Sequence, residues 1–362
     1  MHSLTKIKIM ALFTFAIFAV TYLVTKGSTQ TKVETAGQKF KSIKVLNDMP
    51  ADQMGKVMNM ISASLGVNCG FCHASNDGDY EKEGNEHKDM ARKMMKMVFD
   101  LNKSQFNGRP EINCFTCHHG ISHPQPSFPL VAAVPPAERP KQPEKKPTVD
   151  EILAKFETAV GGKVNLAKIT SRQIKANRIE PNGKTTEPEV IWVKPNRYVS
   201  DLSYGTYVVR ETFDGVAARK FSNAEAIEIK PDEAEQIKRE AELFWPANLK
   251  LIYPKMDYRA VDRIDGREVY TITATTAGNV RERLAFDVLT GLLVRRTAST
   301  PTMFGNFVYQ VDYADYKNFG GVKLPTTIHY AVPNISWTRK ILEVKTNVPV
   351  DDAVFGVPAG KK

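Results

Sequence analysis

Apolar and polar residues alternate with two different periods along this chain of 362 residues. In the first third, apolar side chains recur every three or four residues over 51–64 and 86–102, which is the spacing of one helix face. Most later segments alternate with a period of two, as strands do when one face of a sheet is buried. The pattern therefore predicts two helices followed by a β-rich region.

The β-rich region is expected to begin after a short helix over 148–160, where Thr148 and Glu151 fit a capping box. One further helix is expected over 232–244. Asn-Gly, Asp-Gly and Gly-Gly pairs separate the strands, and the spacing predicts an antiparallel meander that curls into a sheet or half-barrel. The expected strands are 197–203, 207–213, 216–221, 267–275, 281–288, 292–298, 307–316, 326–332 and 336–345.

The N-terminus has the pattern of a targeting signal. Lys6 and Lys8 precede the apolar run Ile9–Val24, which is short for a bilayer span of about 20 residues. No Ala-x-Ala site follows, which favours an uncleaved signal-anchor over a cleaved signal peptide. The lysines would stay inside by the positive-inside rule, so the rest of the chain would lie across the membrane.

The four cysteines of the chain lie in two C-x-x-C-H segments, the attachment pattern of c-type haem. Two thiols add to the vinyl groups of one haem, and the adjacent histidine supplies the proximal imidazole. Two alternatives are a zinc site, which needs no histidine after both pairs, and redox disulfides, which lack a βαβ context here. We therefore predict two covalently attached haem c groups. The expected haem-binding residues are Cys69, Cys72 and His73 for the first haem, and Cys114, Cys117 and His118 for the second.

Methionines are abundant on both expected helices and offer a sixth iron ligand, since a thioether favours Fe(II). They also suit a soft core, which is the alternative interpretation. His87, His119 and His123 are the histidines that would replace a methionine. The candidates are Met54, Met58 and Met60 for the first haem, and Met90, Met94, Met95 and Met97 for the second.

Residues 43–125 resemble the photosynthetic reaction-centre cytochrome c subunit. The resemblance lies in Leu65–His73, in the run Ala91–Met97, and in Cys114–Gly120. It implies helix, turn and C-x-x-C-H units with a helix methionine as sixth ligand, and it points to Met58 and Met94. That subunit carries four haems and this chain has two motifs, and His119 stands where the family often has arginine.

The C-terminal half weakly resembles the LolA/LolB-like lipoprotein carriers, in its helix-first order, its consecutive hairpins and its ending Val348–Phe355. In that family the concave face of the sheet holds acyl chains. Aromatic residues such as Trp192, Tyr198 and Trp245 would line such a hollow here, although a plain core explains them as well. The resemblance implies a lipid as a candidate ligand of this half.

Together these patterns predict an α + β multidomain protein, with a mostly α-helical dihaem cytochrome c domain followed by an antiparallel β-sheet or half-barrel domain with a few helices. The Pro-rich stretch 124–147 cannot form a core and is typical of a semi-rigid linker. The expected parts are a signal-anchor over 1–30, the dihaem domain over 31–123, the linker over 124–147 and the LolA-like domain over 148–362.

The formal net charge of +10 suits an anionic membrane surface or an acidic redox partner. No helix-turn-helix, zinc finger or arginine-rich run supports nucleic acid. The first hypothesis is an electron carrier rather than an enzyme, placed on the periplasmic side of the inner membrane by its N-terminal helix, or free in the periplasm if that segment is cleaved. It would exchange electrons with a donor and an acceptor protein in the membrane. The alternatives are a dihaem peroxidase, which needs an open iron site, and a lipid- or protein-binding module with a haem electron port.

Overall fold

The computed structural model describes residues 33–73, 79–125, 140–186, 188–205, 207–243 and 249–358. The expected signal-anchor over 1–30, most of the linker and Trp245 lie outside these ranges. Contacts divide the chain into two compact units, Met1–Ala51 and Asp52–Lys362. None of the described helices is long and apolar enough to span a bilayer.

The first unit contains the short helix α2 (Ala36–Lys39). The chain after this helix turns back and pairs with the residues at the start of the helix. Thr35 forms an antiparallel bridge with Pro50, and the amide of Ala36 donates to the carbonyl of Met49 at 2.7 Å. Ala36 and Met49 are both almost completely buried. This small fold immediately precedes the helices that carry the haem motifs.

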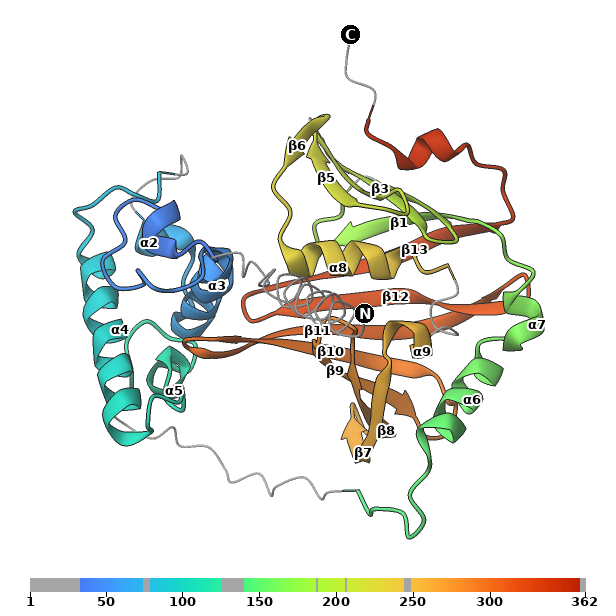
Figure 1. Cartoon of the computed structure of the whole chain (residues 1–362), viewed down its shortest axis with the longest axis horizontal. Helices are drawn as coiled ribbons and strands as arrows, with labels where there is room; N and C mark the ends of the chain where they lie inside the picture. The colour runs from blue at the N-terminus through green and yellow to red at the C-terminus, as the bar shows by residue number, and fades with distance from the viewer. Residues whose placement is uncertain are drawn as a thin grey trace, which may run out of the picture. The chain divides into compact units, whose positions relative to one another are not determined.

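The second unit is built on one antiparallel sheet of 13 strands, ordered β6-β5-β4-β3-β2-β1-β13-β12-β11-β10-β9-β8-β7 (Figure 1). Every neighbouring pair is sequential except β1 and β13, which join the first half of the meander to its end. The strands are β1 Arg172–Ile179, β2 Glu189–Lys194, β3 Arg197–Tyr204, β4 Tyr207–Phe213, β5 Ala218–Ser222, β6 Glu225–Ile227, β7 Lys255–Ile264, β8 Arg267–Thr275, β9 Arg281–Asp287, β10 Leu293–Thr302, β11 Gly305–Phe319, β12 Val322–Val332 and β13 Ile335–Thr346.

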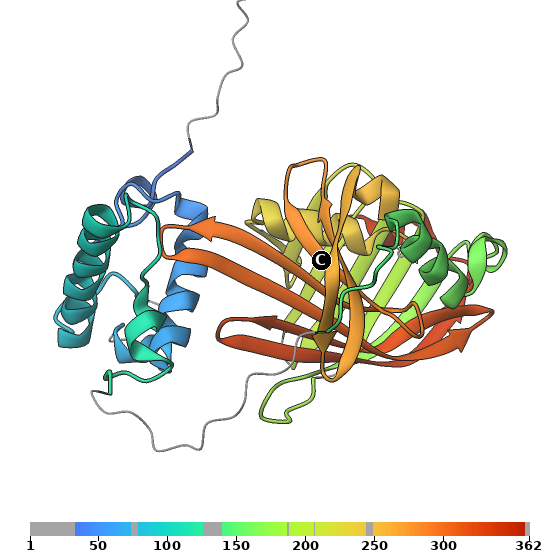
Figure 2. The same cartoon turned by 90° about the horizontal axis from the view of Figure 1, so that it is seen from below.

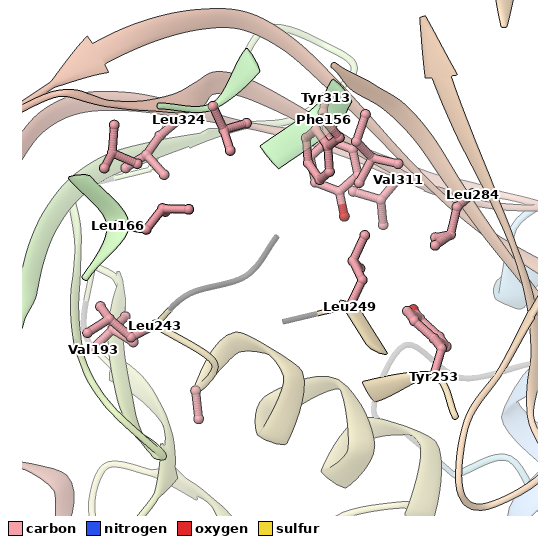
Figure 3. Close-up of a cluster of buried hydrophobic side chains, with 14 of the residues drawn as sticks. Phe156, Leu166, Val193, Leu243, Leu249, Tyr253, Leu284, Val311, Tyr313 and Leu324 are labelled. Atoms are coloured by element: carbon pink, nitrogen blue, oxygen red, sulfur yellow. The ribbon is translucent and has the colours of Figure 1, made fainter. Parts of the chain in front are cut away.

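Four short helices accompany the sheet: α6 (Val149–Ala159), α7 (Gly162–Leu166), α8 (Pro231–Glu240) and α9 (Leu249–Ile252). The expected capping box forms at α6, where the Thr148 hydroxyl accepts from the amide of Glu151 at 3.2 Å. The apolar sides of the helices and the inner face of the sheet share one core. Figure 3 shows Phe156 of α6 and Leu249 of α9 beside Val311 and Tyr313 of β11.

The helical region that carries the cysteines comprises η1 (Ala51–Gln53), α3 (Met54–Leu65), η2 (Cys69–Phe71), α4 (Glu86–Gln105) and α5 (Cys114–His118). Gly66 ends α3 with φ +64°, and a Cβ placed there would lie 2.0 Å from the carbonyl oxygen of Gly120. The amide of Gly120 donates to the carbonyl of Ser64 at 2.9 Å. The end of α3 therefore touches the turn after α5, which only a glycine at position 66 allows.

The β10–β11 hairpin reaches into this helical region, as both views of the chain show (Figures 1 and 2). Its tip residue Phe304 is 1% exposed. The Phe304 ring lies 5.0 Å from the ring of Phe99 in α4, and its carbonyl accepts from the side-chain amide of Asn113 at 3.2 Å. Gln53 bonds in the same way to the carbonyl of Pro301 on β10.

The fold class expected from the sequence is wrong. The described chain is dominated by the antiparallel sheet rather than by helices, because the helical region is short and the strands are longer and more numerous than the period-two pattern suggested. Four strands were missed, β1, β2, β6 and β7. Arginines share one side of β1 with Ile174 and Ala176, and the alternation of β7 changes phase at the irregularity between Tyr258 and Ala260, so neither strand keeps one clean alternation over its whole length. The bounds of the four expected parts stay a prediction.

Candidate haem-binding site

The first C-x-x-C-H segment forms a single tight turn after α3. The amide of Cys72 donates to the carbonyl of Cys69 at 3.3 Å, and the amide of His73 donates to the same carbonyl at 3.0 Å. Helical winding over residues that are three and four apart brings their side chains to one side. Local hydrogen bonding thus places both thiols and the imidazole where one planar group could meet them.

The second segment is a short helix, α5, with a defined start and end. The side chain of Asn113 caps it by accepting from the amide of Thr116 at 3.3 Å, and His119 ends it with φ +51°. The same Asn113 holds the carbonyl of Phe304, so one residue fixes both the motif and the hairpin tip.

The histidine of each motif is oriented by a backbone carbonyl. Nδ1 of His73 lies 3.2 Å from the carbonyl oxygen of Tyr80, and Nδ1 of His118 lies 3.0 Å from that of Ile121. A carbonyl can only accept, so Nδ1 carries the proton and Nε2 keeps its lone pair for a metal. Burial lowers the pKa of His73, which favours the neutral, ligating form.

The four thiols are free, and no disulfide joins them. Burial raises the pKa of Cys72 and of Cys114, so both are protonated thiols at neutral pH. Within the described residues, no three His, Cys, Asp or Glu side chains gather closely enough to hold a metal ion among them. The thiols stand in separate pairs, each beside its own histidine.

A cavity of about 240 Å³ lies next to the second motif. Apolar groups from α3, α5 and the hairpin form most of its wall, and the cysteine thiol nearest to it is that of Cys114. Thr302 donates to the sulfur of Met60 at 3.6 Å beside it. The lining residues are Met60, Ile61, Ala63, Ser64, Asn113, Cys114, Phe115, Phe304 and Pro333.

Large apolar side chains are exposed along α4 and in and after α5. Along α4 they recur at helical spacing, and Phe115 of α5 is 53% exposed. Exposed apolar surface suits the binding of an apolar group, and an apolar ring system such as haem is one. The residues are Met90, Met97 and Leu101 of α4, Phe115 of α5 and Ile121 after it.

The first motif is packed against the start of α4. The Phe71 ring stacks on the His87 ring with centroids 4.1 Å apart, and Asn85 donates to the Phe71 carbonyl at 3.2 Å. Lys88 donates to the Tyr80 carbonyl at 3.0 Å, the same oxygen that His73 uses. The Tyr80 carbonyl therefore accepts from both His73 and Lys88. In the described contacts, no lysine donates to the Ile121 carbonyl beside His118.

The expected methionine ligands lie on the helix faces predicted for them. Met58 is half-buried on α3, and Met94 is half-buried on α4 between the exposed Met90 and Met97. The alternative ligands are placed differently, since His87 is stacked on Phe71 and His119 lies edge-on to Phe115 with centroids 5.5 Å apart. The assignment of Met58 and Met94 as ligands stays a prediction.

Four contributors to the site were not foreseen from the sequence. Asn113 and Lys88 act on backbone carbonyls, which a spacing motif does not encode. Phe304 comes from a strand hairpin far along the chain. The only available signal was an apolar tip, Met303-Phe304, between two alternating segments where a polar turn is usual. The close approach of Gly66 to Gly120 had no signal beyond the glycines themselves.

Two one-turn C-x-x-C-H segments with carbonyl-bound histidines have the pattern by which c-type haem is attached. Residues 14–150 match the model of the family described as photosynthetic reaction centre cytochrome C subunit. A photosynthetic reaction center cytochrome c subunit from Roseobacter denitrificans is 29% identical over 97 residues, which are 24% of this chain and 26% of the relative. The resemblance inferred from the sequence is confirmed, and this chain matches about a quarter of that relative's length.

Solved structures similar to this chain include a LolA superfamily protein from Nitrosomonas europaea, at 13% identity and a TM-score of 0.42, covering 58% of this chain and 98% of that one. A putative outer membrane lipoprotein-sorting protein domain from Vibrio parahaemolyticus has 10% identity and a TM-score of 0.34, covering 57% and 93%. The LolA-like resemblance seen in the sequence recurs among these solved structures.

Proposed function

We propose that this protein is a dihaem c-type cytochrome that carries electrons between redox partners on the periplasmic side of the inner membrane. The observation that carries the proposal is the pair of C-x-x-C-H turns, each with two free thiols and a histidine whose Nδ1 is held by a carbonyl. The match of residues 14–150 to a cytochrome c family supports it.

Haem c bound at these motifs would supply one-electron iron chemistry. The chain's own part is to hold the two groups and to limit their contact with water. Cys69, Cys72, Cys114 and Cys117 would form the thioether links, and His73 and His118 would each present Nε2. The exposed apolar surface on α4 and α5 would be covered by the second haem.

Closeness of the two motifs favours exchange of electrons between them. Gly66 stands shortly before the first motif and Gly120 shortly after the second, and their backbones are in contact. Cys69 and Cys117, one from each motif, are exposed. An arrangement with both motifs near the surface suits a carrier that meets partner proteins on both sides.

The anchor assignment rests on the apolar run Ile9–Val24 and on the cytochrome family that matches the chain. A membrane-held carrier would remain beside its membrane donors and acceptors. Separation of membrane and soluble fractions, followed by haem staining, tests this part of the proposal. Haem-stained protein found only in the cytoplasm would contradict it.

Haem stoichiometry tests the central claim. The denatured protein should retain two haems per chain, and changing both cysteines of one motif to alanine should leave one. We expect Cys69→Ala/Cys72→Ala and Cys114→Ala/Cys117→Ala to lose different haems, each distinguishable by its optical spectrum. A denatured wild-type chain without bound haem would overturn the proposal.

The sixth ligands are tested separately. Met58→Ala or Met94→Ala should lower the potential of one haem or make it high-spin, while covalent attachment persists. The matched control is Met256→Ala, a methionine of β7 outside the helical region. If the redox and optical properties of a variant are unchanged, that methionine is not the ligand.

A further inference from the structure

A second cavity lies on the inner side of the large sheet, remote in sequence from the cysteines. It has a volume of about 100 Å³ and walls that are mainly apolar and aromatic. Since one water needs about 10–15 Å³ of such volume, the cavity holds several waters or a compact organic molecule. Phe156, Ile191, Val193, Leu293 and Leu324 are among its apolar lining residues.

The charged lining of this cavity is predominantly cationic. Arg172, Arg239, Arg296, Arg339 and Lys323 line it, against the carboxylates of Glu240 and Glu242. Two further carboxylates stand outside the lining and pair with three of these arginines, Glu189 with Arg339 at 2.8 Å, and Glu282 with Arg239 at 2.6 Å and with Arg296 at 3.3 Å. Five cations thus meet four carboxylates, and Lys323 is the exposed one, at the rim.

Arg172, the first residue of β1, is the arginine of this lining that has no ion-pair partner among the described residues. Its Nη2 donates to the carbonyl of Leu243, while its buried Nε has no hydrogen-bond partner. No carboxylate of the described chain lies within the 4.0 Å of an ion pair with it. The nearby Glu240 is engaged with Gln236 at 3.0 Å.

The environment of Arg172 is unfavourable for an uncompensated charge. Burial lowers its pKa to about 10, and Glu240 and Glu242 offset this effect only in part. A charge withdrawn from water is unfavourable unless an opposite charge or a hydrogen bond compensates it. By contrast, Arg339 makes two bonds to Glu189, both of 2.8 Å. Within this cavity, the protein therefore neutralises the charge of Arg339 but not the charge of Arg172.

We propose that this cavity binds a small monocarboxylate with a short apolar body, its carboxylate on the guanidinium of Arg172. A planar carboxylate can accept from Nε and an Nη of one guanidinium, which would satisfy the orphan Nε. The apolar body would lie against side chains such as Phe156 and Leu324. Since an apolar cavity of about 150 Å³ takes benzene, the volume of about 100 Å³ leads us to expect a body of about four to five carbons. The inference goes beyond electron transfer and does not depend on haem.

The test uses the full-length holoprotein and three probes measured by isothermal titration calorimetry: hexanoate, the uncharged hexanamide and inorganic phosphate. Hexanoate should bind saturably with one site per chain. Hexanamide and phosphate should each bind at least tenfold more weakly than hexanoate. Hexanamide lacks the negative charge, and phosphate lacks the apolar body. Equal affinity for either of them, or no binding of hexanoate, would overturn the proposal.

Variants assign the site to Arg172. Arg172→Met should weaken hexanoate at least tenfold and, without ligand, should melt no lower than the parent because an unpaired buried charge is removed. The matched control is Arg263→Met, a half-exposed arginine on β7, which should bind hexanoate like the parent. Unchanged affinity in Arg172→Met would also refute the site. If that variant does not fold, Arg172→Lys replaces it and should bind with reduced affinity.

Discussion

The tip of the β10–β11 hairpin offers the sharpest test of how the helical region and the sheet are joined. We expect Phe304→Ala to destabilise both together. The ring is 1% exposed, and it packs against Phe99 at a centroid distance of 5.0 Å. Truncating a buried phenylalanine costs about 3–5 kcal/mol. Because the void would open beside an existing cavity of about 240 Å³, we expect little collapse around it and a value in the upper half of that range.

Urea unfolding followed by far-ultraviolet circular dichroism measures the loss, and the haem absorbance bands report the surroundings of Cys114. The control is Val308→Ala on β11 of the same hairpin, where the side chain is 40% exposed and the change should stay within about 0.5 kcal/mol. In Phe304→Ala the absorbance of the second haem and the circular dichroism signal should both change at a lower urea concentration than in the parent. A loss of less than about 1 kcal/mol, with unchanged haem bands, would show that the hairpin tip does not hold the two regions together.

Three further predictions concern single residues. Lys88→Met should lower the potential of the first haem by about 20–60 mV relative to the second in a spectroelectrochemical titration. The reason is that the Tyr80 carbonyl loses one hydrogen bond worth about 0.5–1.5 kcal/mol. Equal shifts at both haems would contradict this prediction. Gly66→Ala should destabilise the helical region in urea unfolding, because φ +64° alone costs about 1–2 kcal/mol and the new Cβ meets Gly120; parent-like unfolding would show that the contact relaxes freely. Burial alone would raise the pKa of Glu282, but the arginines beside it lower that pKa overall. The ionised Glu282 therefore stabilises the fold fully above its unfolded-state pKa of about 4.3, and this stabilisation is lost as the pH falls through its lower folded-state pKa. Glu282→Gln should therefore be less stable at pH 7 and flatter in stability below about pH 4, and an acid profile identical to the parent's would refute this.

Glycine turns made parts of the sheet predictable to the residue. β4 and β8 have the bounds that the sequence indicated, because Gly205 and Gly215 flank β4 and Gly266 precedes β8. β1 was missed because Arg172 and Arg178 occupy positions that a simple strand would fill with apolar residues. Arg172 among them lines the cavity, so the break in the pattern marks a chemical feature rather than a loop.

The haem motifs were predictable because covalent chemistry fixes their spacing. What orients their histidines was not, because Tyr80 and Ile121 contribute carbonyl oxygens, which every residue possesses. The partner of Asn113 was equally hidden, since Phe304 lies 191 positions further along the chain. Local sequence specifies the ligands, whereas long-range packing specifies how they are held.

The two candidate sites are alike because each contains groups in an unfavourable environment that a ligand would relieve. Along α4 and α5 the uncovered groups are apolar, since Met90, Met97 and Phe115 are exposed to water. In the sheet the group is charged, since Arg172 has no ion-pair partner among the described residues. Apolar area gains about 25 cal/mol for each Å² that is covered, so haem attachment should stabilise the helical region, whereas an anion should stabilise the sheet. The hairpin that carries Phe304 connects the two regions, so each ligand should also reduce the local opening of the part that it does not touch.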